Sequence, residues 1–366
     1  MENRSKFWDT YGKFFLALAI VLSLTSIVMN LLSRRLETET EPEETAAAGE
    51  FWIGTEETRV INVLSAGAVM PCSDIKPDHV FANLGSTVKN YDVAAVSMHS
   101  LVGSDITRSF GEKLIEQGYG MYGLAYPGAL SFGKEGIDKS MGFWDAQRVR
   151  TSGTHTSTDT SNMIRMSEYN GISVIYLSYT DILDGTLPEN ENYLVNVYND
   201  EKTPLFVNEA AGMADVVVVS ITWAGEPGAL PNERQRKIAE ALAGAGASII
   251  CGYSEHAVQP ACWIDDTLVF YSLGDLYSEE EDVTARIGAL GAVTVTETVY
   301  GDKSRVELIN PKMDLVVSVP DGEGHCDVKL LKDADEEEVP DHKELYEGYT
   351  QTLQRMDDSI RIGGLN

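Results

Sequence analysis

The sequence predicts a layered α/β domain that follows a membrane-spanning segment. Three observations lead to this prediction: short apolar runs punctuated by glycine, helical segments between several of those runs, and one long uncharged stretch near the N-terminus. Apolar runs without strict alternation are typical of strands buried on both faces, and intervening helices indicate a sheet covered by helices. With 366 residues, 43% of them hydrophobic, the chain is long enough for one large domain with appended segments.

The uncharged stretch Phe14–Leu32 comes first along the chain. As a helix it would span roughly 28 Å, close to the thickness of the bilayer hydrocarbon. Basic residues flank it on both sides, and the following "NLLSRRLE" is a poor cleavage site for a signal peptide. We therefore expect residues 1–13 in the cytoplasm, residues 14–32 as an uncleaved single-pass transmembrane helix, and the main domain outside the cell.

An acidic flexible stalk is expected over residues 33–58, and the extracytoplasmic domain over residues 59–330. Strands are predicted at residues 58–70, 91–98, 171–179, 214–222, 247–252 and 267–273, and separate antiparallel strands at 292–300, 304–309 and 314–319. Helices are predicted at residues 109–118 and 231–247, the second with Pro231 in its first turn.

Two further segments stand apart from this pattern. Residues 123–162 are rich in Gly, Ser and Thr and predict a long loop over the strand ends. The acidic tail, residues 331–366, has Tyr346, Leu353 and Ile360 among apolar residues at helical spacing, which predicts an amphipathic helix. We expect this helix to dock on the domain; a contact surface for a partner protein is the alternative.

Composition and motifs exclude several classes of function. With 28 basic and 57 acidic residues the net charge is −29, which argues against binding nucleic acid or anionic lipid. The absence of GxSxG, P-loop and HExxH motifs disfavours serine hydrolases, nucleotide hydrolases and zinc proteases. The four cysteines contain no CxxC, and the spacing leaves open whether Cys251 and Cys262 form a disulfide or remain buried thiols.

Residues 215–278 contain the ordered segments "ITWAGEPGALP", "QRKIAEAL", "CGYSEHAVQP" and "VFYSLGD". Together they resemble the CapA/PgsA family of bacterial capsule and poly-γ-glutamate synthesis proteins, and weaker matches extend over residues 60–300. The matching residues are Trp223, Glu226, Pro231, Gln235, Gly252, His256, Gln259, Pro260, Tyr271, Ser272, Leu273 and Gly274. The resemblance implies a calcineurin-like metallophosphoesterase fold, a four-layer α/β/β/α sandwich, in a membrane-anchored protein whose domain lies outside the cell.

The family's metal-ligand positions are mostly changed in this chain. Ala68, Gly85 and Thr222 stand where the family has Asp, Glu and His, and Tyr253 and Ser254 replace two histidines. A divalent cation needs several convergent ligands, which these side chains do not supply. We therefore expect neither a metal nor any other cofactor, although a divalent metal is possible in related proteins.

The candidate site residues come from the positions that keep polar or aromatic groups. The catalytic candidates are His256, Asp105 and Glu226. The substrate-binding candidates are Trp223, Tyr253, Ser254, His99, Thr222 and His155. Structural roles stay open: Asp105 could cap the helix that follows it, Trp223 could fill the core, and the histidines could be hydrogen-bonded loop residues.

Our main hypothesis is a membrane-anchored extracytoplasmic protein that assists synthesis, export or retention of a capsule or poly-γ-glutamate-type polymer. It would act by binding, as a pseudoenzyme without metal-dependent hydrolysis. Its expected partners are the cell-surface polymer or its synthesis complex, and the membrane through the N-terminal helix, but not nucleic acid. Two alternatives remain: a hydrolase or transferase that acts on a surface polymer with a rebuilt site, and an adaptor in a surface-assembly complex.

Overall fold

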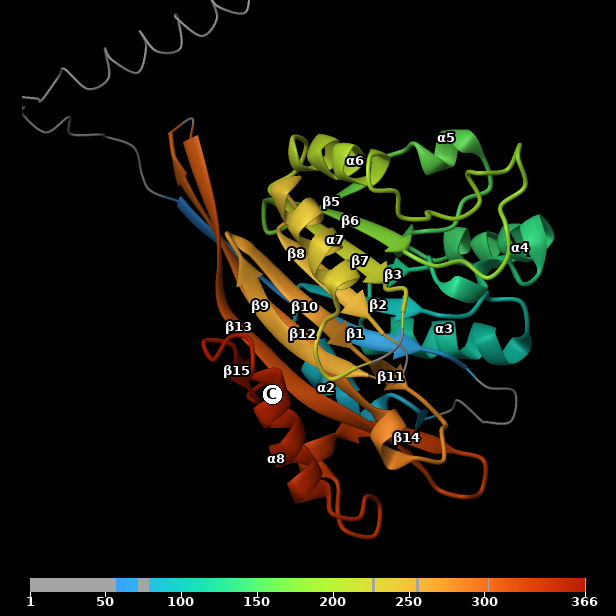
Figure 1. The fold of residues 1–366 in the computed structure, drawn as a ribbon, viewed down its shortest axis with the longest axis vertical. Coiled ribbons are helices and arrows are strands. Elements are labelled where there is room, and N and C mark those ends of the chain that lie inside the picture. The colour runs from blue at the N-terminus through green and yellow to red at the C-terminus, as the bar shows by residue number, and fades with distance from the viewer. Residues whose placement is uncertain (1–56, 72–78, 226–227, 255–256, 302, 366) are drawn as a thin grey trace, which may run out of the picture. The chain divides into compact units, whose positions relative to one another are not determined.

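A computed structural model describes residues 57–71, 79–225, 228–254, 257–301 and 303–365 (Figure 1). The chain separates into the units Met1–Gly54 and Thr55–Asn366, and every described residue belongs to the second. The predicted transmembrane helix at residues 14–32 and nearly all of the predicted stalk lie outside the described residues. No helix within the described ranges is long and apolar enough to cross a membrane.

Two β-sheets form the centre of the domain. Within the described residues, the larger sheet has nine strands in the order β14–β13–β12–β1–β2–β3–β4, with β11 paired to β1 and β15 to β13. These strands are β1 Glu57–Val69, β2 Val93–Met98, β3 Met121–Gly123, β4 Arg150–Ser152, β11 Asp275–Tyr277, β12 Ile287–Tyr300, β13 Lys303–Pro320, β14 Cys326–Leu330 and β15 Arg361–Ile362. Strands β1 to β4 run parallel, whereas β12 to β14 form antiparallel pairs.

The second sheet has six strands in the order β5–β6–β7–β8–β10–β9 within the described part of the chain. They are β5 Met166–Tyr169, β6 Ile172–Thr180, β7 Val216–Thr222, β8 Ile249–Tyr253, β9 Val258–Ile264 and β10 Thr267–Leu273. Strands β6, β7, β8 and β10 are mutually parallel, so their carboxyl ends meet at one edge of the sheet.

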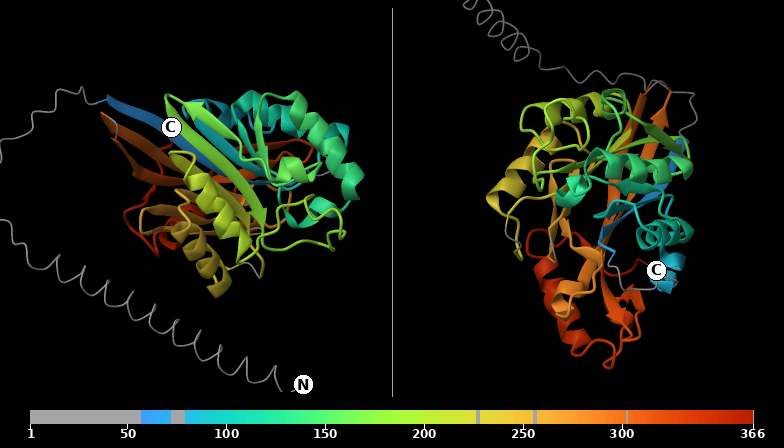
Figure 2. Two further views of the ribbon diagram at one scale, coloured as in Figure 1. Left: turned by 90° about the horizontal axis from the view of Figure 1, so that it is seen from above. Right: turned by 90° about the vertical axis from the view of Figure 1, so that its right-hand side faces the viewer.

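The sheets pack face to face and helices cover their outer faces (Figure 2). The inner core joins residues such as Val63 and Val293 to Val218 and Phe270. One outer layer contains α2 (Gly85–Val88), α3 (Asp105–Gln117) and α4 (Gly133–Ala146); the other contains α6 (Lys202–Ala211) and α7 (Glu233–Gly244). The predicted mixed α/β sandwich is confirmed.

The long segment at residues 123–162 differs from the predicted loop. It contains the 3-10 turn η3 (Pro127–Leu130), helix α4, strand β4 and the short helix α5 (Thr158–Ser161). Helix α4 buries Ile137, Met141 and Trp144, an i, i+4, i+7 stripe, while its glycines obscure the pattern in the sequence. The segment therefore builds one wall of the domain and is not a free loop.

Three smaller expectations are also corrected. The predicted strands at 304–309 and 314–319 are one continuous strand, β13. Helix α7 begins at Glu233 after the N-cap Asn232, so Pro231 precedes the cap and does not lie in the first turn. Strand β9 was not predicted, because it contains Pro260; β9 is an edge strand, where a residue without an N–H is tolerated.

The tail forms a helix, α8 (His342–Leu353), that packs against β9. Two short 3-10 turns, η4 (Val283–Arg286) and η5 (Leu331–Asp333), precede it in the sequence. Its Tyr346 and Leu353 side chains contact the core between the sheets. Tyr346 also donates a hydrogen bond from its hydroxyl to Asp314 Oδ1 at 3.2 Å, while Lys332 Nζ lies 2.9 Å from Asp314 Oδ2. These contacts dock α8 on the domain.

Candidate functional site

A cavity of about 390 Å³ lies beyond the carboxyl ends of β2, β7 and β8, and we call it the strand-end cavity. Because His99 follows β2, Thr222 ends β7 and Tyr253 ends β8, the two sheets bring these three side chains to one place. Trp223 and Ser254, each one residue further along, complete the set of predicted substrate-binding residues that line it.

His99 is held in the strand-end cavity as a neutral hydrogen-bonded ring. Its Nε2 lies 3.2 Å from Thr222 Oγ1, and that hydroxyl donates to the Ala125 carbonyl at 3.3 Å, so His99 Nε2–H is the donor. The ring stacks on Tyr126 at 5.6 Å and meets the edge of Tyr253 at 5.9 Å. Burial lowers the pKa of His99 to about 4, so the imidazole is uncharged at neutral pH.

Trp223 forms a fixed wall of the cavity. Its Nε1 donates to the Tyr271 carbonyl at 2.5 Å, and its ring packs in the outer core of the second sheet. A Cβ at Gly252 would lie 2.2 Å from Trp223 Nε1 and 2.2 Å from the Tyr271 oxygen. Glycine is therefore required at position 252, and the core-filling role of Trp223 is the one that its contacts support.

Two glutamines connect the loops beside the cavity. Gln235 Nε2 lies 2.9 Å from Gln259 Oε1 and 3.2 Å from Ser254 Oγ. Gln259 Nε2 donates to the Gly228 carbonyl at 2.8 Å, and the backbone N–H of Asn232 donates to Gln235 Oε1 at 2.8 Å. Gln235 and Gln259, which match the family pattern, thus hold the loops beside the cavity in place, a role that the sequence analysis did not predict.

An ion-pair network stiffens the rim on the side of β6 and β7. Arg234 on α7 makes a bidentate pair with Asp181, with distances of 2.7 and 3.2 Å, and Asp181 has a side chain that is only 5% exposed. Arg234 also pairs with Asp200 at 2.8 Å and lies over the Tyr198 ring. The hydrogen bonds that Arg234 donates to Asp181 raise the pKa of Arg234, and the hydrogen bond that Arg234 donates to Asp200 lowers the pKa of Asp200.

The three catalytic candidates are not assembled by the described residues. Glu226 and His256 lie outside them. Asp105 lies in the exposed first turn of α3 and is not among the residues lining the strand-end cavity. The N-cap of α3 is Ser104, whose hydroxyl accepts from the Thr107 backbone N–H at 3.2 Å, so the expected capping role of Asp105 is wrong by one position.

His155 belongs to a different place in the fold. It lies in a small hollow of about 40 Å³ beside β4, with Thr160 and Arg165, and does not line the strand-end cavity. Its Nε2 donates to Asn196 Oδ1 at 3.0 Å. Burial lowers the pKa of His155 to about 4, the Asn196 hydrogen bond opposes this shift, and the charge of Arg165 adds to it.

Three polar side chains that line the strand-end cavity were missed by the sequence analysis: Tyr126, Asp184 and Asp275. Asp275 is buried and lies two residues after the end of the predicted strand at 267–273, which is a signal that could have identified it. Tyr126 and Asp184 come from irregular segments beside η3 and after β6, where the sequence carries no comparable signal.

The donors in the described part of the cavity do not fit a metal ion. The described residues hold no group of three or more His, Cys, Asp or Glu side chains placed to bind one. The Nε2 atom of His99 is hydrogen-bonded to Thr222, so it is not available as a metal ligand in this arrangement. Ala68, which stands at a family ligand position, is buried in the core between the sheets.

Cys251, Cys262 and Cys326, the cysteines that the structure describes, are free thiols. Cys251 faces the core between the sheets and donates to Ser65 Oγ at 3.1 Å, whereas Cys262 packs on the outer face of the same sheet. Burial raises the pKa of Cys251 to about 12 and that of Cys262 to about 11. The disulfide considered from the sequence is therefore absent between these two residues.

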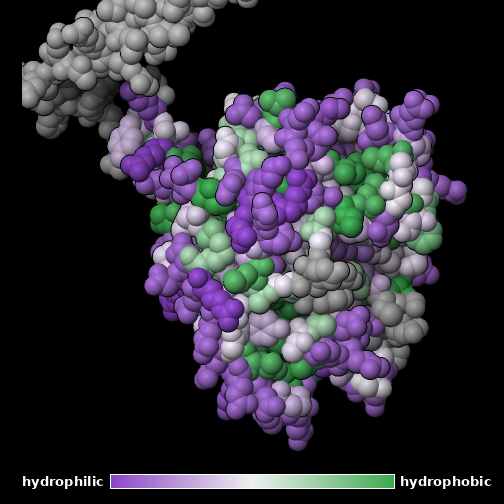
Figure 3. All heavy atoms as spheres, viewed as in Figure 1, coloured by the Kyte–Doolittle hydropathy of each residue, from purple (hydrophilic) through white to green (hydrophobic). Residues whose placement is uncertain are grey.

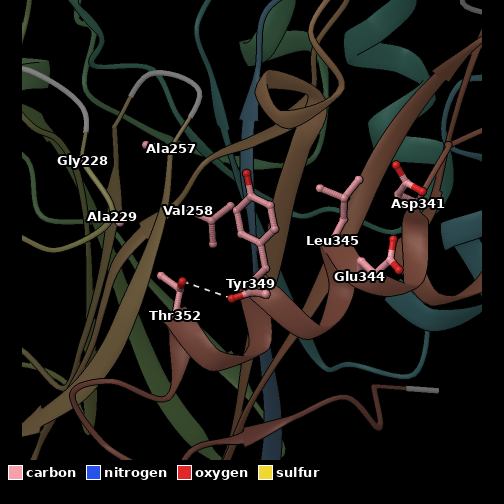
Figure 4. A pocket seen from close by; sticks show the side chains of 10 residues that line it. Gly228, Ala229, Ala257, Val258, Asp341, Glu344, Leu345, Tyr349 and Thr352 are labelled. Carbon is pink, nitrogen blue, oxygen red and sulfur yellow. Dashed lines mark hydrogen bonds between the residues drawn. The ribbon is translucent and has the colours of Figure 1, made fainter.

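A second hollow, of about 690 Å³, lies between α8 and the start of β9 (Figure 4). Leu345 and Tyr349 of α8 lie across from Ala257 and Val258, and Asp341 lies toward one end.

On the face drawn in Figure 3 hydrophilic residues predominate, as the strong negative charge of the chain leads one to expect.

Comparisons with known proteins place the chain among capsule proteins. It is 26% identical over 227 residues to the PGA biosynthesis protein CapA of Bacillus subtilis (strain 168), covering 58% of this chain and 56% of that protein. It is 27% identical over 203 residues to the capsule biosynthesis protein CapA of Bacillus anthracis, covering 52% and 47%. The chain thus spans about half the length of the curated relatives that it matches.

Similarity to solved structures is distant. A Staphylococcus aureus structure described as a candidate 5'-nucleotidase in complex with alpha-ketoglutarate aligns with 81% of this chain and 58% of its own, at a TM-score of 0.42 and 13% identity. The family model described as bacterial capsule synthesis protein PGA_cap matches residues 61–280. The chain is therefore a member of this bacterial capsule synthesis family.

Proposed function

We propose that this chain is a membrane-anchored, extracytoplasmic accessory protein that assists synthesis, export or retention of a poly-γ-glutamate-type capsule polymer. Its family membership and the names of its two Bacillus relatives support the polymer class. The uncharged run Phe14–Leu32 supports the anchor, and the basic residues that precede it support a cytoplasmic N-terminus. The sandwich of two sheets supports a fold of the calcineurin-like metallophosphoesterase type.

The observation that carries this proposal is the composition of the strand-end cavity. Hydrogen-bonding groups from His99, Thr222 and Ser254 and the rings of Tyr126 and Tyr253 surround a space of about 390 Å³. Asp184 and Asp275 add two carboxyl groups to this lining, and nothing positively charged lines it among the described residues. Hydrogen-bonding groups and carboxyl oxygens between aromatic walls suit the recognition of an amide or hydroxyl group of a ligand. The donor set does not suit tight binding of a divalent ion, so the site acts as a binding pocket.

The neutral state of His99 matters for this role. An uncharged imidazole with Nε2–H committed to Thr222 presents no positive charge to the cavity. The pocket therefore recognises a polar, uncharged part of the polymer, such as its amide backbone, and the carboxylates of the polymer must be accommodated elsewhere.

The proposal is tested with the purified full-length chain in detergent. We expect it to bind a γ-linked glutamate oligomer, to contain Mn, Fe or Zn at well below one equivalent, and to leave phosphoester substrates intact. Thr222→Val should weaken oligomer binding, while the exposed control Thr158→Val should not. Stoichiometric metal together with phosphoester cleavage would show that the chain is an active metallophosphoesterase and would overturn the proposal.

Cellular location is tested separately. In intact cells of a capsule-forming host, added protease should digest residues 59–365 and leave a membrane-bound N-terminal fragment. Full protection of the domain in intact cells, with digestion only after lysis, would contradict the extracytoplasmic assignment.

A further inference from the structure

A group of arginines lies on the domain at a distance from the residues of the strand-end cavity. Arg148, Arg150 and Arg165 line a hollow of about 560 Å³ at the edge formed by β4 and β5. Arg148 lies in the short connection between α4 and β4, Arg150 begins β4, and Arg165 directly precedes β5. The fold therefore brings together positive charges in a chain whose net charge is −29.

These guanidinium groups are not used to stabilise the fold. Within the described residues, the side chains of Arg148 and Arg165 make neither a hydrogen bond nor an ion pair, and the Arg150 guanidinium donates from Nε to Ser167 Oγ at 2.7 Å. Asp145 and Glu168 line the same hollow without forming ion pairs to these arginines. By contrast, Arg59 and Arg234 each pair with two carboxylates.

The hollow continues into the one that contains His155. Asp145, Thr151 and Arg165 line both, so the two hollows form one groove along the exposed edge of the sandwich. The His155 end adds the hydroxyls of Thr156 and Thr160. We call this continuous surface the arginine groove.

We propose that the arginine groove binds a segment of an extended polyamide that carries carboxylates, through bidentate pairs between its arginines and those carboxylates. This inference rests on the proposed function and assigns a second contact surface for the same polymer. Arginine presents two parallel N–H groups that match a carboxylate, and the carboxylates and hydroxyls of the groove accept the N–H groups of an amide backbone.

Local charge explains how an acidic protein can hold an acidic polymer. At physiological ionic strength a charge is screened beyond about 8 Å, so the polymer segment in the groove responds mainly to the nearby arginines. The acidic residues elsewhere then repel chain segments that lie outside the groove. Such an arrangement favours an extended polymer bound at one defined surface.

The test compares two full-length variants with equal loss of charge. Arg148→Gln/Arg150→Gln/Arg165→Gln removes the groove charges, and Lys303→Gln/Arg305→Gln/Arg355→Gln removes three exposed charges elsewhere. Binding of a γ-linked glutamate oligomer is measured by calorimetry at several salt concentrations, with a γ-linked glutamine oligomer and polyphosphate as comparison ligands. We expect the groove variant to bind the glutamate oligomer about tenfold or more weakly with a shallower salt dependence, and the control variant to stay within about twofold of the original.

Each other outcome is decisive. Equal weakening of oligomer binding in both variants would show that net charge alone causes the effect. Unchanged binding in the groove variant would show that the polymer contacts another surface. Either result overturns the proposed role of the arginine groove, while the proposed function stands. Polyphosphate binding as tight as that of the glutamate oligomer would overturn recognition of a polyamide. If the original chain binds no glutamate oligomer at all, the proposed function itself fails.

Discussion

The strand-end cavity and the arginine groove treat polar groups in opposite ways. In the cavity, the polar pair His99–Thr222 is neutral and hydrogen-bonded, and the charged side chains in the described lining are the acidic Asp184 and Asp275. In the groove, Arg148 and Arg165 are exposed and have no partner within the described residues. Fixed neutral groups discriminate between ligands by geometry, whereas exposed cations attract an anionic ligand with less demand on its shape. From this comparison we infer that the strand-end cavity selects the ligand and that the arginine groove retains the anionic polymer.

The two partly buried histidines, His99 and His155, give the largest expected effect. His99 beside the cavity and His155 beside the groove each have a pKa near 4 in the folded state, against about 6.5 in an unfolded chain. Between these values the unfolded state binds more protons, so the stabilisation is complete above about pH 6.5 and is lost as the pH falls toward 4. Each histidine should contribute a loss of up to about 3 kcal/mol, measured by urea denaturation across this range.

The double variant His99→Gln/His155→Gln serves as the control for this prediction. It should show a much flatter loss of stability between about pH 6.5 and pH 4. The same steep loss in the double variant would mean that other groups cause the acid sensitivity.

The arginines provide the next comparison. Arg234→Met should lower the free energy of unfolding by about 2 to 3 kcal/mol, because it leaves the Asp181 carboxylate buried without its guanidinium partner. Arg148→Met, in the groove, should change stability by less than about 0.5 kcal/mol. Equal effects of the two substitutions in chemical denaturation would contradict the division into paired structural and unpaired binding arginines.

Removal of one hydroxyl in the cavity should have a smaller effect. Thr222→Val keeps the shape of the side chain but leaves His99 Nε2–H without its acceptor, and should lower stability by about 1 kcal/mol. The matched substitution Thr158→Val, at an exposed position of α5, should be close to neutral. A neutral Thr222→Val would show that the His99–Thr222 hydrogen bond does not hold the ring.

The smallest expected effect concerns electrostatic contact within the groove. Arg165→Gln should raise the pKa of His155 slightly, since the charge of Arg165 lowers it, and should leave the pKa of His99 unchanged. Titration of the imidazole signals by NMR measures both values, with Arg305→Gln as the control. An equal shift at both histidines would indicate a general field effect and not proximity in the groove.

The parallel strands were predictable because they are buried on both faces, so their apolar runs stand out in the sequence. The neighbouring parallel strands β7 and β8 end at one edge, which places Thr222 beside Tyr253. His99 follows β2 in the other sheet and joins them because the two sheets pack face to face. Helix α4 was missed because glycines dilute its apolar stripe, and β9 because proline within a run argues against a strand unless the strand is known to lie at an edge.

The remaining parts of the sites depend on contacts between distant segments. Arg165 approaches Arg148 and Arg150 only because β4 and β5 lie at neighbouring edges of different sheets. Gln235 can bond to Gln259 only because α7 and β9 come together in the fold. Asp105 was predicted at the site, but it lies in the first turn of α3 and does not line the cavity, which the order of residues in the sequence does not reveal. No local sequence pattern predicts these contacts between distant segments.

The central claim is that this chain holds a carboxylated polyamide without using a bound metal. The most direct measurement is the affinity of the full-length chain for a γ-linked glutamate oligomer, taken after exhaustive EDTA treatment and again with added Mn²⁺. The account predicts clear binding in EDTA, with affinity within about twofold in the two conditions. Binding that appears only with the metal, or shortening of the oligomer during the measurement, would contradict it.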